Sequence, residues 1–134
     1  MLNTKRQQPS VERPRILVVD DEDMILRLME RFFQKSGYEV DLARERNQAE
    51  TLLENHRYDL VVTDLGVTDF HEPGGLEILE LGRRPESEPK LIILTGDGRP
   101  EVERECLGRG AHLFLSKPQP LDQLGQAVSG LLEN

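Results

Sequence analysis

Residues 15–22 read RILVVDDE, an aliphatic run that passes directly into three acidic residues. The run at 16–19 is continuous and partly β-branched, which is typical of a strand buried on both faces of a parallel sheet. Residues 59–67 (DLVVTDLGV) and 91–96 (LIILTG) follow the same pattern, with a polar residue where the apolar run ends. These segments predict an α/β fold with a polar site at the carboxyl ends of its strands.

Two further short runs, at 40–43 and 113–115, complete a predicted set of strands with 16–19, 60–63 and 91–94. The run at 40–43 is more mixed in polarity and suits an edge strand. Helical patterns separate the runs, and right-handed crossovers between parallel strands give a doubly wound sheet. We therefore predict one α/β domain over residues 15–134, preceded by a loose polar tail over residues 1–14.

Apolar residues at helical spacing predict the inward faces of the helices. Ile25, Leu28, Met29 and Phe32 recur at the spacing of one helix face, and Gly37 supplies a stop. The helix that begins near Pro100 has a thin apolar stripe and should be the least firmly docked. The other inward residues that we predict are Ala49, Leu52 and Leu53 in 47–56, Leu76, Ile78 and Leu79 in 75–82, Val102, Cys106 and Leu107 after Pro100, and Leu124, Val128 and Leu131 in 121–132.

The composition argues against several classes of protein. The net charge of −8 disfavours a nucleic-acid-binding protein, because such proteins hold phosphates with clustered Lys and Arg. Cys106 is the one cysteine, so the chain forms no internal disulfide and a cysteine-based metal site is not expected. The sequence has neither an apolar stretch of membrane-spanning length nor a secretory signal. We expect a cytoplasmic protein without direct contact to nucleic acid or membrane.

Polar residues of complementary chemistry follow four of the predicted strands. Asp20 and Asp21 follow the first, Asp64 the third, Thr95 the fourth and Lys117 the fifth. Each of these residues alone is more often a helix cap, a turn residue or a solvated surface group. Capping and turn formation give no reason for all of them to stand at strand carboxyl ends. We therefore interpret them as one site.

The predicted site has a coherent chemistry. Clustered carboxylates repel one another unless a proton or a cation compensates their charge. Oxygen ligands without Cys or His favour a hard divalent cation, Mg²⁺ or Mn²⁺. A carboxylate can also act as a nucleophile and form an aspartyl phosphate. Lys117 would then balance charge on the transferred group, and Thr95 can donate a hydrogen bond to a phosphoryl oxygen.

The segments VVDDE (18–22), DLVVTDLGV (59–67), LIILTG (91–96) and GAHLFLSKP (110–118) resemble the signature regions of the response regulator receiver family. The resemblance covers about residues 15–134. It implies a flavodoxin-like, CheY-like (βα)5 fold with strand order 2-1-3-4-5. It also implies a two-component phosphorelay switch and not an enzyme, apart from self-catalysed phosphoryl transfer and autodephosphorylation. The implied partners are a sensor histidine kinase or phosphotransfer protein and an unidentified downstream protein.

The resemblance assigns roles in phosphoryl transfer to matching residues. Asp64 would accept the phosphoryl group from a phosphohistidine, and Thr95 and Lys117 would bind its oxygens. Phe114 would occupy the position of the switch aromatic. We hypothesise that Thr95 swings toward the phosphoryl group and that Phe114 fills the space it vacates; the alternative is that Phe114 is only a core or surface aromatic. The Lys117–Pro118 bond would be cis. The surface that reports phosphorylation would comprise the helix after Pro100, the run at 113–115 and the last helix.

The resemblance also implies a ligand set for Mg²⁺ or Mn²⁺. Asp21, Asp64 and the backbone carbonyl of Gly66 would bind the cation directly. Asp20 would assist through a water molecule.

The loop at 65–75, LGVTDFHEPGG, departs from the family pattern. It is longer than usual and lacks the Met-Pro pair that normally follows the phosphoacceptor. His71 and Glu72 are more often solvent-exposed in such a loop but could influence donor choice. Gly66 and Asp97 stand at positions that tune hydrolysis in this family. They predict a short-lived phosphoryl group.

Two other interpretations remain open at the level of sequence. The first is a receiver-like interaction module that is not phosphorylated, which the divergent loop favours and the full set of site residues disfavours. The second is an enzyme on a similar fold. An aspartate-nucleophile phosphatase would have a second Asp where Gly66 stands, and the acidic residues 20–23 would repel the phosphate of a flavin.

Overall fold

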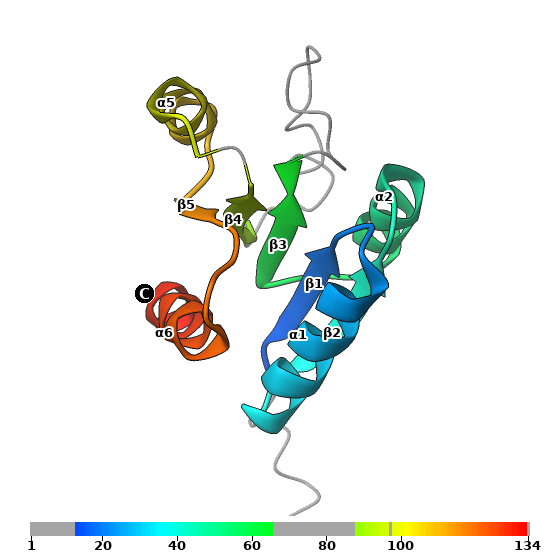
Figure 1. Ribbon diagram of the computed structural model, residues 1–134. Helices are drawn as coiled ribbons and strands as arrows, with labels where there is room; N and C mark the ends of the chain where they lie inside the picture. Colours follow the sequence, from blue (N-terminus) through cyan, green and yellow to red (C-terminus); the bar gives the residue numbers. More distant parts are fainter. Residues whose placement is uncertain (1–12, 66–87, 97, 134) are drawn as a thin grey trace, which may run out of the picture.

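The computed structural model describes residues 13–65, 88–96 and 98–133. Within them, parallel strands form one 5-stranded sheet in the order β2-β1-β3-β4-β5, which confirms the predicted doubly wound topology (Figure 1). The half-exposed β2 lies at an edge, as its mixed composition predicts. The strands are β1 (Arg15–Val19), β2 (Glu39–Ala43), β3 (Leu60–Asp64), β4 (Lys90–Thr95) and β5 (Leu113–Ser116).

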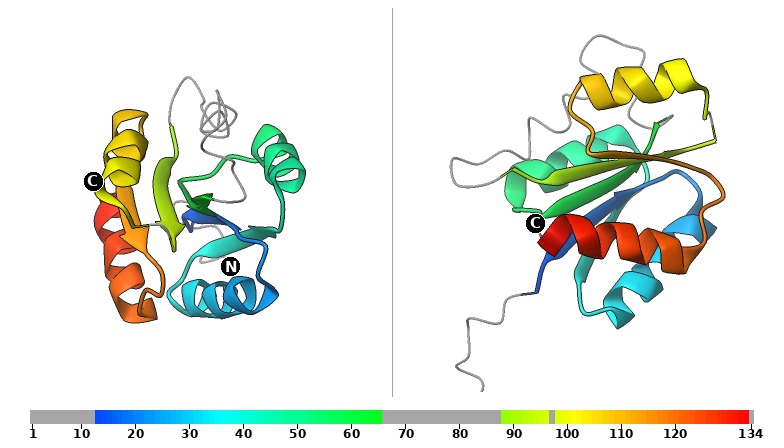
Figure 2. Two further views of the ribbon diagram at one scale, coloured as in Figure 1. Left: turned by 45° about the horizontal axis from the view of Figure 1, so that its top comes forward. Right: turned by 90° about the vertical axis from the view of Figure 1, so that its left-hand side faces the viewer.

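Helices cover both faces of the sheet. Helix α1 (Asp23–Lys35) and α6 (Leu121–Glu133) lie on one face, and α2 (Arg46–Asn55) and α5 (Pro100–Gly108) lie on the other (Figure 2). None of the helices within the described residues has the length and apolar character that crossing a membrane requires. Residues 1–12 of the predicted tail and the predicted helix at 75–82, with Leu76, Ile78 and Leu79, lie outside the described residues.

Alternate residues of each strand pack into two separate core layers. Leu17 and Val19 of β1 join the layer under α2 and α5, whereas Ile16 and Val18 join the layer under α1 and α6. Successive side chains of a strand point to opposite faces, so a strand covered on both faces must be apolar at every position. This requirement explains why the central strands read as continuous aliphatic runs.

The inward face of α1 differs from the prediction at Leu28, which turns outward, and at Leu26 and Phe33, which are buried but were not predicted. Leu26, Met29 and Phe33 are buried, with Phe32 half-buried beside them, but Leu28 is 50% exposed. Leu28 stands about 200° around the helix from Leu26, because each residue advances the helix by about 100°. The prediction for Leu28 was therefore wrong.

A similar difference occurs in α5. Val102 and Cys106 are buried, as predicted, but Leu107 is 41% exposed. Leu107 follows Cys106 directly and therefore points about 100° away from it on the helix. The prediction for Leu107 was wrong, while the weak docking of α5 stays a prediction. The buried residues Ala49, Leu53, Leu124 and Val128 and the half-buried Leu52 and Leu131 agree with the predicted faces.

The predicted stop after the first helix is present at Gly37. Helix α1 ends at Lys35, and Gly37 adopts a φ of 99°, a left-handed conformation that favours glycine. The N–H of Gly37 donates to the carbonyl of Gln34, and the N–H of Tyr38 donates to that of Phe33. These bonds satisfy carbonyls at the helix end and direct the chain into β2.

A polar network ties the edge strand β2 to its neighbours. The guanidinium of Arg15 donates to Asp41 at 3.0 Å and to Glu39 at 2.9 Å. The hydroxyl of the buried Tyr58 donates to the same Asp41 carboxylate at 2.6 Å. Burial, then the hydrogen bond to Asp41, raises the pKa of Tyr58 well above its ordinary value. The carboxylates of β2 are thus already compensated within the fold.

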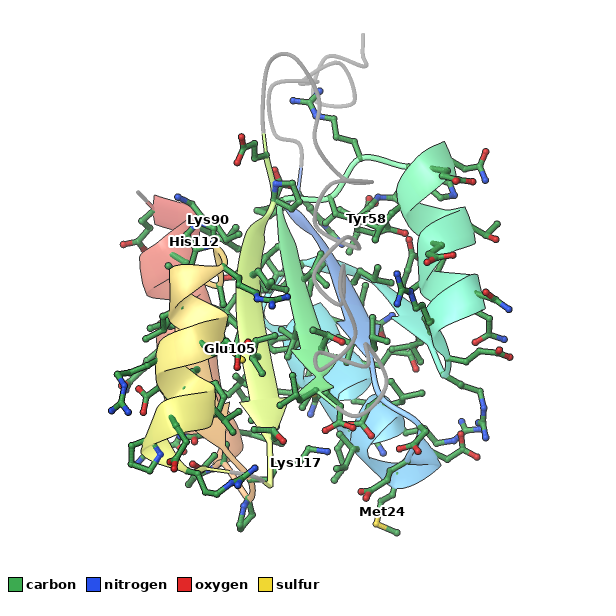
Figure 3. All side chains as sticks on the ribbon, turned by 90° about the horizontal axis from the view of Figure 1, so that it is seen from above. Met24, Tyr58, Lys90, Glu105, His112 and Lys117 are labelled. Atoms are coloured by element: carbon green, nitrogen blue, oxygen red, sulfur yellow. The ribbon has the colours of Figure 1, made fainter. Side chains whose placement is uncertain are left out.

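A histidine fastens β4 to β5 at the end of the sheet opposite Lys117 (Figure 3). The backbone N–H of Leu91 donates to Nδ1 of His112 at 3.0 Å, and the N–H of His112 donates to the carbonyl of Leu91 at 2.8 Å. Nδ1 can accept this bond only when it carries no proton. Burial, together with the charge of Lys90, lowers the pKa of His112, while Glu88 opposes the shift.

Helices α1 and α6 meet at a glycine. A Cβ atom on Gly125 of α6 would lie 2.8 Å from Cε2 of Phe32 of α1. The same atom on Gly130, further along α6, would meet nothing within 4 Å. Gly125 therefore permits a close approach between the helices that a larger residue would disturb.

Stability should fall as pH drops below the ordinary pKa of histidine, because His112 is held neutral in the folded state. Its folded pKa lies below the ordinary value of 6.5, so the unfolded chain binds the proton more tightly. The contribution of His112 is fully present above pH 6.5 and is lost as pH falls through the folded pKa. In His112→Asn, an amide oxygen can accept from Leu91 without titrating. Urea unfolding at a series of pH values should show a smaller acid loss for this variant, and equal losses would contradict the assignment.

Two alanine substitutions on α6 should have opposite effects on stability. Gly125→Ala should lower the free energy of unfolding by about 1–3 kcal/mol, because its methyl group overlaps the ring of Phe32. Gly130→Ala should raise it by about 0.5–1 kcal/mol, because alanine is the better helix former where space is open. Urea unfolding of both variants measures the two changes in the free energy of unfolding. A loss of stability in Gly130→Ala as large as that in Gly125→Ala would show that helix propensity and space do not decide the outcome.

Candidate functional site

The turn between β1 and α1 presents two adjacent carboxylates. Asp20 follows the last residue of β1 and is 2% exposed, whereas Asp21 is exposed. The Asp20 side chain accepts a hydrogen bond from the N–H of Glu22 at 2.9 Å, and its own N–H donates to Ala43 of β2 at 3.0 Å. Both the carboxylate and the backbone N–H of Asp20 are thus hydrogen-bonded to the backbone of other residues, which holds Asp20 in place at the end of the sheet.

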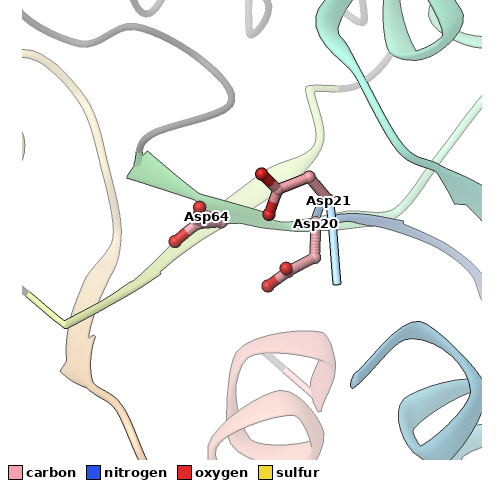
Figure 4. A group of neighbouring side chains, drawn as sticks. All are labelled: Asp20, Asp21 and Asp64. Carbon is pink, nitrogen blue, oxygen red and sulfur yellow. The ribbon is translucent and has the colours of Figure 1, made fainter. Parts of the chain in front are cut away.

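Asp64 brings a third carboxylate to this position. It is the last residue of β3, one residue beyond the predicted end of the strand, and its side chain is 17% exposed. Carboxylate oxygens of Asp20, Asp21 and Asp64 all lie within 4.8 Å of one another (Figure 4). The structure therefore brings together three of the residues that the sequence analysis grouped from distant segments.

Lys117 supplies the positive charge of the site. Its Nζ lies 2.8 Å from Oδ2 of Asp20 and 3.2 Å from Oδ1 of Asp64. The N–H of Lys117 donates to the carbonyl of Thr95 at 2.7 Å, and the Lys117–Pro118 bond is cis, as the resemblance implies. Lys117 therefore joins the carboxyl ends of β1, β3 and β4.

Thr95 and Phe114 lie on β4 and β5, the two strands on the opposite side of β3 from β1. Thr95 is the last residue of β4, is 5% exposed, and pairs in register with Ser116 of β5. Phe114 is half-buried on β5 and packs against the core layer that includes Val102 and Cys106 of α5. One short stretch of sheet thus connects the site to the underside of α5.

The charges of the site act on one another because the groups are partly shielded from water. Burial raises the pKa of Asp64; Lys117 opposes this shift, and the charges of Asp20 and Asp21 add to it. Burial alone would lower the pKa of Lys117, but its hydrogen bond to Asp20 and the charge of Asp64 outweigh burial and raise it. The site therefore favours a protonated lysine and leaves the acidic cluster short of positive charge.

The donor set fits a hard divalent cation. One ammonium group cannot balance three carboxylates that lie within 4.8 Å of one another. Their ligand atoms are all oxygens, which Mg²⁺ and Mn²⁺ prefer. An acidic pocket suited to such a cation is therefore present at the carboxyl edge of the sheet.

One close contact at this edge was not anticipated from the sequence. A Cβ atom on Gly98 would lie 2.7 Å from Oγ of Ser116 and 3.7 Å from its Cβ, so Gly98 lies close to the hydroxyl group of Ser116 at the end of β5. A glycine in a loop gives no sign of such an approach. Gly66, His71, Glu72 and Asp97, with the loop at 66–75, lie outside the described residues.

Relatives with assigned functions are transcriptional or regulatory proteins. The alginate biosynthesis transcriptional regulatory protein AlgB of Pseudomonas putida is 35% identical over 119 residues, which is 89% of this chain and 26% of AlgB. The photosynthetic apparatus regulatory protein RegA of Rhodobacter capsulatus is 27% identical over 113 residues, 84% of this chain and 60% of RegA. The chain thus spans only part of the length of these relatives.

Solved structures with the same fold include a CheY-like response regulator receiver domain protein from Methanospirillum hungatei JF-1. It has a TM-score of 0.77 at 28% identity and covers 91% of this chain and 95% of its own. The signal receiver domain of a putative Luxo repressor protein from Vibrio parahaemolyticus has a TM-score of 0.78 at 24% identity, covers 91% of this chain and 92% of its own, and shows the fold alone.

The family model of the response regulator receiver domain matches residues 16–129, which contain all of the site residues described above and all of the described strand residues except Arg15 at the start of β1. The relatives, the strand order and the acidic edge agree with that match. This chain belongs to the response regulator receiver domain family, the signalling switch of two-component systems.

Proposed function

We propose that Asp64 accepts a phosphoryl group from a phosphohistidine on a partner histidine kinase or phosphotransfer protein. The observation that carries this proposal is the position of Asp64 beside Asp20, Asp21 and the ammonium of Lys117. Asp20 is 2% exposed, whereas the side chain of Asp64 at the end of β3 is 17% exposed, so Asp64 is the more accessible of these two carboxylates. The proposal includes a cytoplasmic location, where such a donor would meet the domain.

The transfer is a displacement at phosphorus. A carboxylate oxygen of Asp64 forms the new P–O bond while the P–N bond of the phosphohistidine breaks, and the imidazole leaves with the electron pair. Lys117 would neutralise charge on the phosphoryl oxygens, and the hydroxyl group of Thr95 would donate a hydrogen bond to one of them. Attack of water at phosphorus would later break this P–O bond, release inorganic phosphate and return Asp64 to a free carboxylate.

Asp20, Asp21, Asp64 and the backbone carbonyl of Gly66 would hold Mg²⁺ or Mn²⁺. The cation would neutralise charge on the phosphoryl oxygens when bound. Gly66 lies outside the described residues, so its part rests on the family resemblance alone.

The new charge on Asp64 would reach the surface through Thr95 and Phe114. A phosphoryl group adds about −1.5 to −2 charges and strong acceptor oxygens. Thr95 would turn toward it, and Phe114, which packs on the layer under α5, would move into the space that Thr95 vacates. The surface of α5, β5 and α6 would then differ between the two states and present a new face to a downstream protein.

A receiver-like module that binds partners without being phosphorylated is the second candidate. The ion pairs of Lys117 with Asp20 and Asp64 favour it in one respect, because they satisfy much of the site without a ligand. The two candidates differ in whether Asp64 reacts with a phosphodonor.

Acetyl phosphate with Mg²⁺ should add one phosphoryl group to the wild-type chain and none to Asp64→Asn. The amide introduced by this substitution keeps the shape of the side chain but lacks the nucleophilic carboxylate. The matched control is Asp122→Asn, an exposed carboxylate on α6 that lies outside the site and should label like the wild type. Intact-mass spectrometry measures the adduct, and resonances of Phe114 and α5 should shift in the labelled sample. An unlabelled wild type would favour the module that is not phosphorylated.

Removal of the Lys117 ammonium should destabilise the fold in metal-free buffer at neutral pH. Lys117→Met leaves the buried carboxylate of Asp20 without its positive partner and should cost about 1–3 kcal/mol. Asp20→Asn added to Lys117→Met should recover part of this loss, because it removes the orphaned charge. Urea unfolding of both variants without divalent cations gives the comparison. A double variant less stable than Lys117→Met would contradict this account.

A further inference from the structure

The free edge of β2 is open over part of its length. Strand β2 pairs with β1 on one side and with no other described strand on its opposite side. The N–H of Glu39 donates to Pro14, and the carbonyl of Ala43 accepts from the N–H of Asp20. Backbone groups alternate in direction along a strand, so the N–H and C=O of Val40 and Leu42 point away from β1.

The edge is closed beyond the end of the strand. Arg44 lies in the bend between β2 and α2, and its N–H donates to Oε1 of Gln48 at 2.7 Å. The outward backbone groups of Val40 and Leu42 are therefore the part of the edge that a partner could bond.

A groove of about 620 Å³ runs beside this edge, with α1 and α2 as its walls. Leu42 lies at the strand, Leu26 and Arg27 belong to the α1 wall, and Leu52 belongs to the α2 wall. Because a helix stands on each side, the groove has room for a single extended chain and hinders the approach of a second helix-covered sheet. On the α2 wall, Leu52 would cover apolar side chains of such a chain, and Asn47, Gln48 and Thr51 make up the polar part of that wall.

One positive charge in the groove, that of Arg27, favours an acidic group in the occupant. Arg44 pairs with Asp23 across one end of the groove. The carboxylates of Glu39 and Asp41 are paired with Arg15. Among the described residues, Arg27 has no ion pair, so its charge on the α1 wall is not compensated.

We propose that the β2 edge binds an extended peptide segment of a partner protein, whose alternating side chains are acidic and apolar. The segment adds to the sheet through the backbone groups of Val40 and Leu42. Its acidic residues face Arg27 on α1, and its apolar residues face Leu52 on α2. This site is separate from the phosphoacceptor function proposed for Asp64 and does not depend on it.

The probe is an acetylated and amidated peptide of sequence Glu-Val-Glu-Val-Glu-Val, titrated into the ¹⁵N-labelled domain. The amide resonances of Val40 and Leu42 should shift most. N-methylation of one alternate set of peptide nitrogens should abolish binding, whereas methylation of the other set should not, because only one set faces β2. A probe with Lys in place of Glu should bind more weakly. Shifts centred on another surface, or equal effects of both methylation patterns, would overturn the proposal.

Two variants and a matched control test the charge of the groove and the backbone groups of the strand edge. Arg27→Glu should weaken binding about three- to tenfold, whereas Arg31→Glu, an exposed residue of the same helix outside the groove, should not. Leu42→Pro removes the outward donor without removing a bond to β1 and should abolish binding. Equal effects of Arg27→Glu and Arg31→Glu would contradict the site.

Two further measurements distinguish peptide binding from self-association at the β2 edge and from the function proposed for Asp64. Concentration-dependent broadening of the Val40 and Leu42 amides without the probe would mean that a second copy pairs with the edge, which would overturn the peptide assignment. Labelling of Arg27→Glu by acetyl phosphate should equal that of the wild type. A failure of peptide binding with normal labelling would thus reject the groove and leave the function of Asp64 intact.

Discussion

The ammonium group of Lys117 lies within 2.8 Å of Asp20 and 3.2 Å of Asp64, two carboxylates from different strands. Without it, acidic groups packed at the end of the sheet would repel one another in a setting partly shielded from water. The same lysine bonds through its backbone to Thr95. A change in the charge at Asp64 therefore acts at once on β1, β4 and β5, which is the physical basis of the proposed switch.

This arrangement depends on the parallel sheet. Parallel strands with helical crossovers bring all their carboxyl ends to one edge, so residues that are far apart in sequence become neighbours there. The alternation of side chains then separates two core layers, and β5 carries Phe114 on the layer shared with α5. The fold thus connects an ionic site to an aliphatic layer through one short strand. A movement of Thr95 would reach α5 through its neighbour β5.

The two ends of the sheet are stabilised by different chemistry. The carboxyl end holds an acidic cluster with a deficit of positive charge, which suits a reactive site. The opposite end holds satisfied hydrogen bonds, such as those of Tyr58 with Asp41 and of Leu91 with His112. The edge of β2 differs from both, because Val40 and Leu42 present backbone groups that no described strand bonds. Binding at that edge would leave the acidic site untouched.

Strand positions, the edge character of β2 and the grouping of Asp20, Asp21, Asp64 and Lys117 could be predicted from the sequence, because burial on both faces demands aliphatic runs and topology collects their carboxyl ends. The predicted inward faces of α2 and α6 agree with the structure, but the sequence did not decide those of α1 and α5 correctly at every position. Leu28 and Leu107 fit a helical period but turn outward, since the angle at which a helix docks depends on its neighbours. The contact of Gly98 with Ser116, the approach of Gly125 to Phe32 and the groove beside β2 were likewise decided by tertiary packing, because each one joins residues whose separation in space no local pattern encodes.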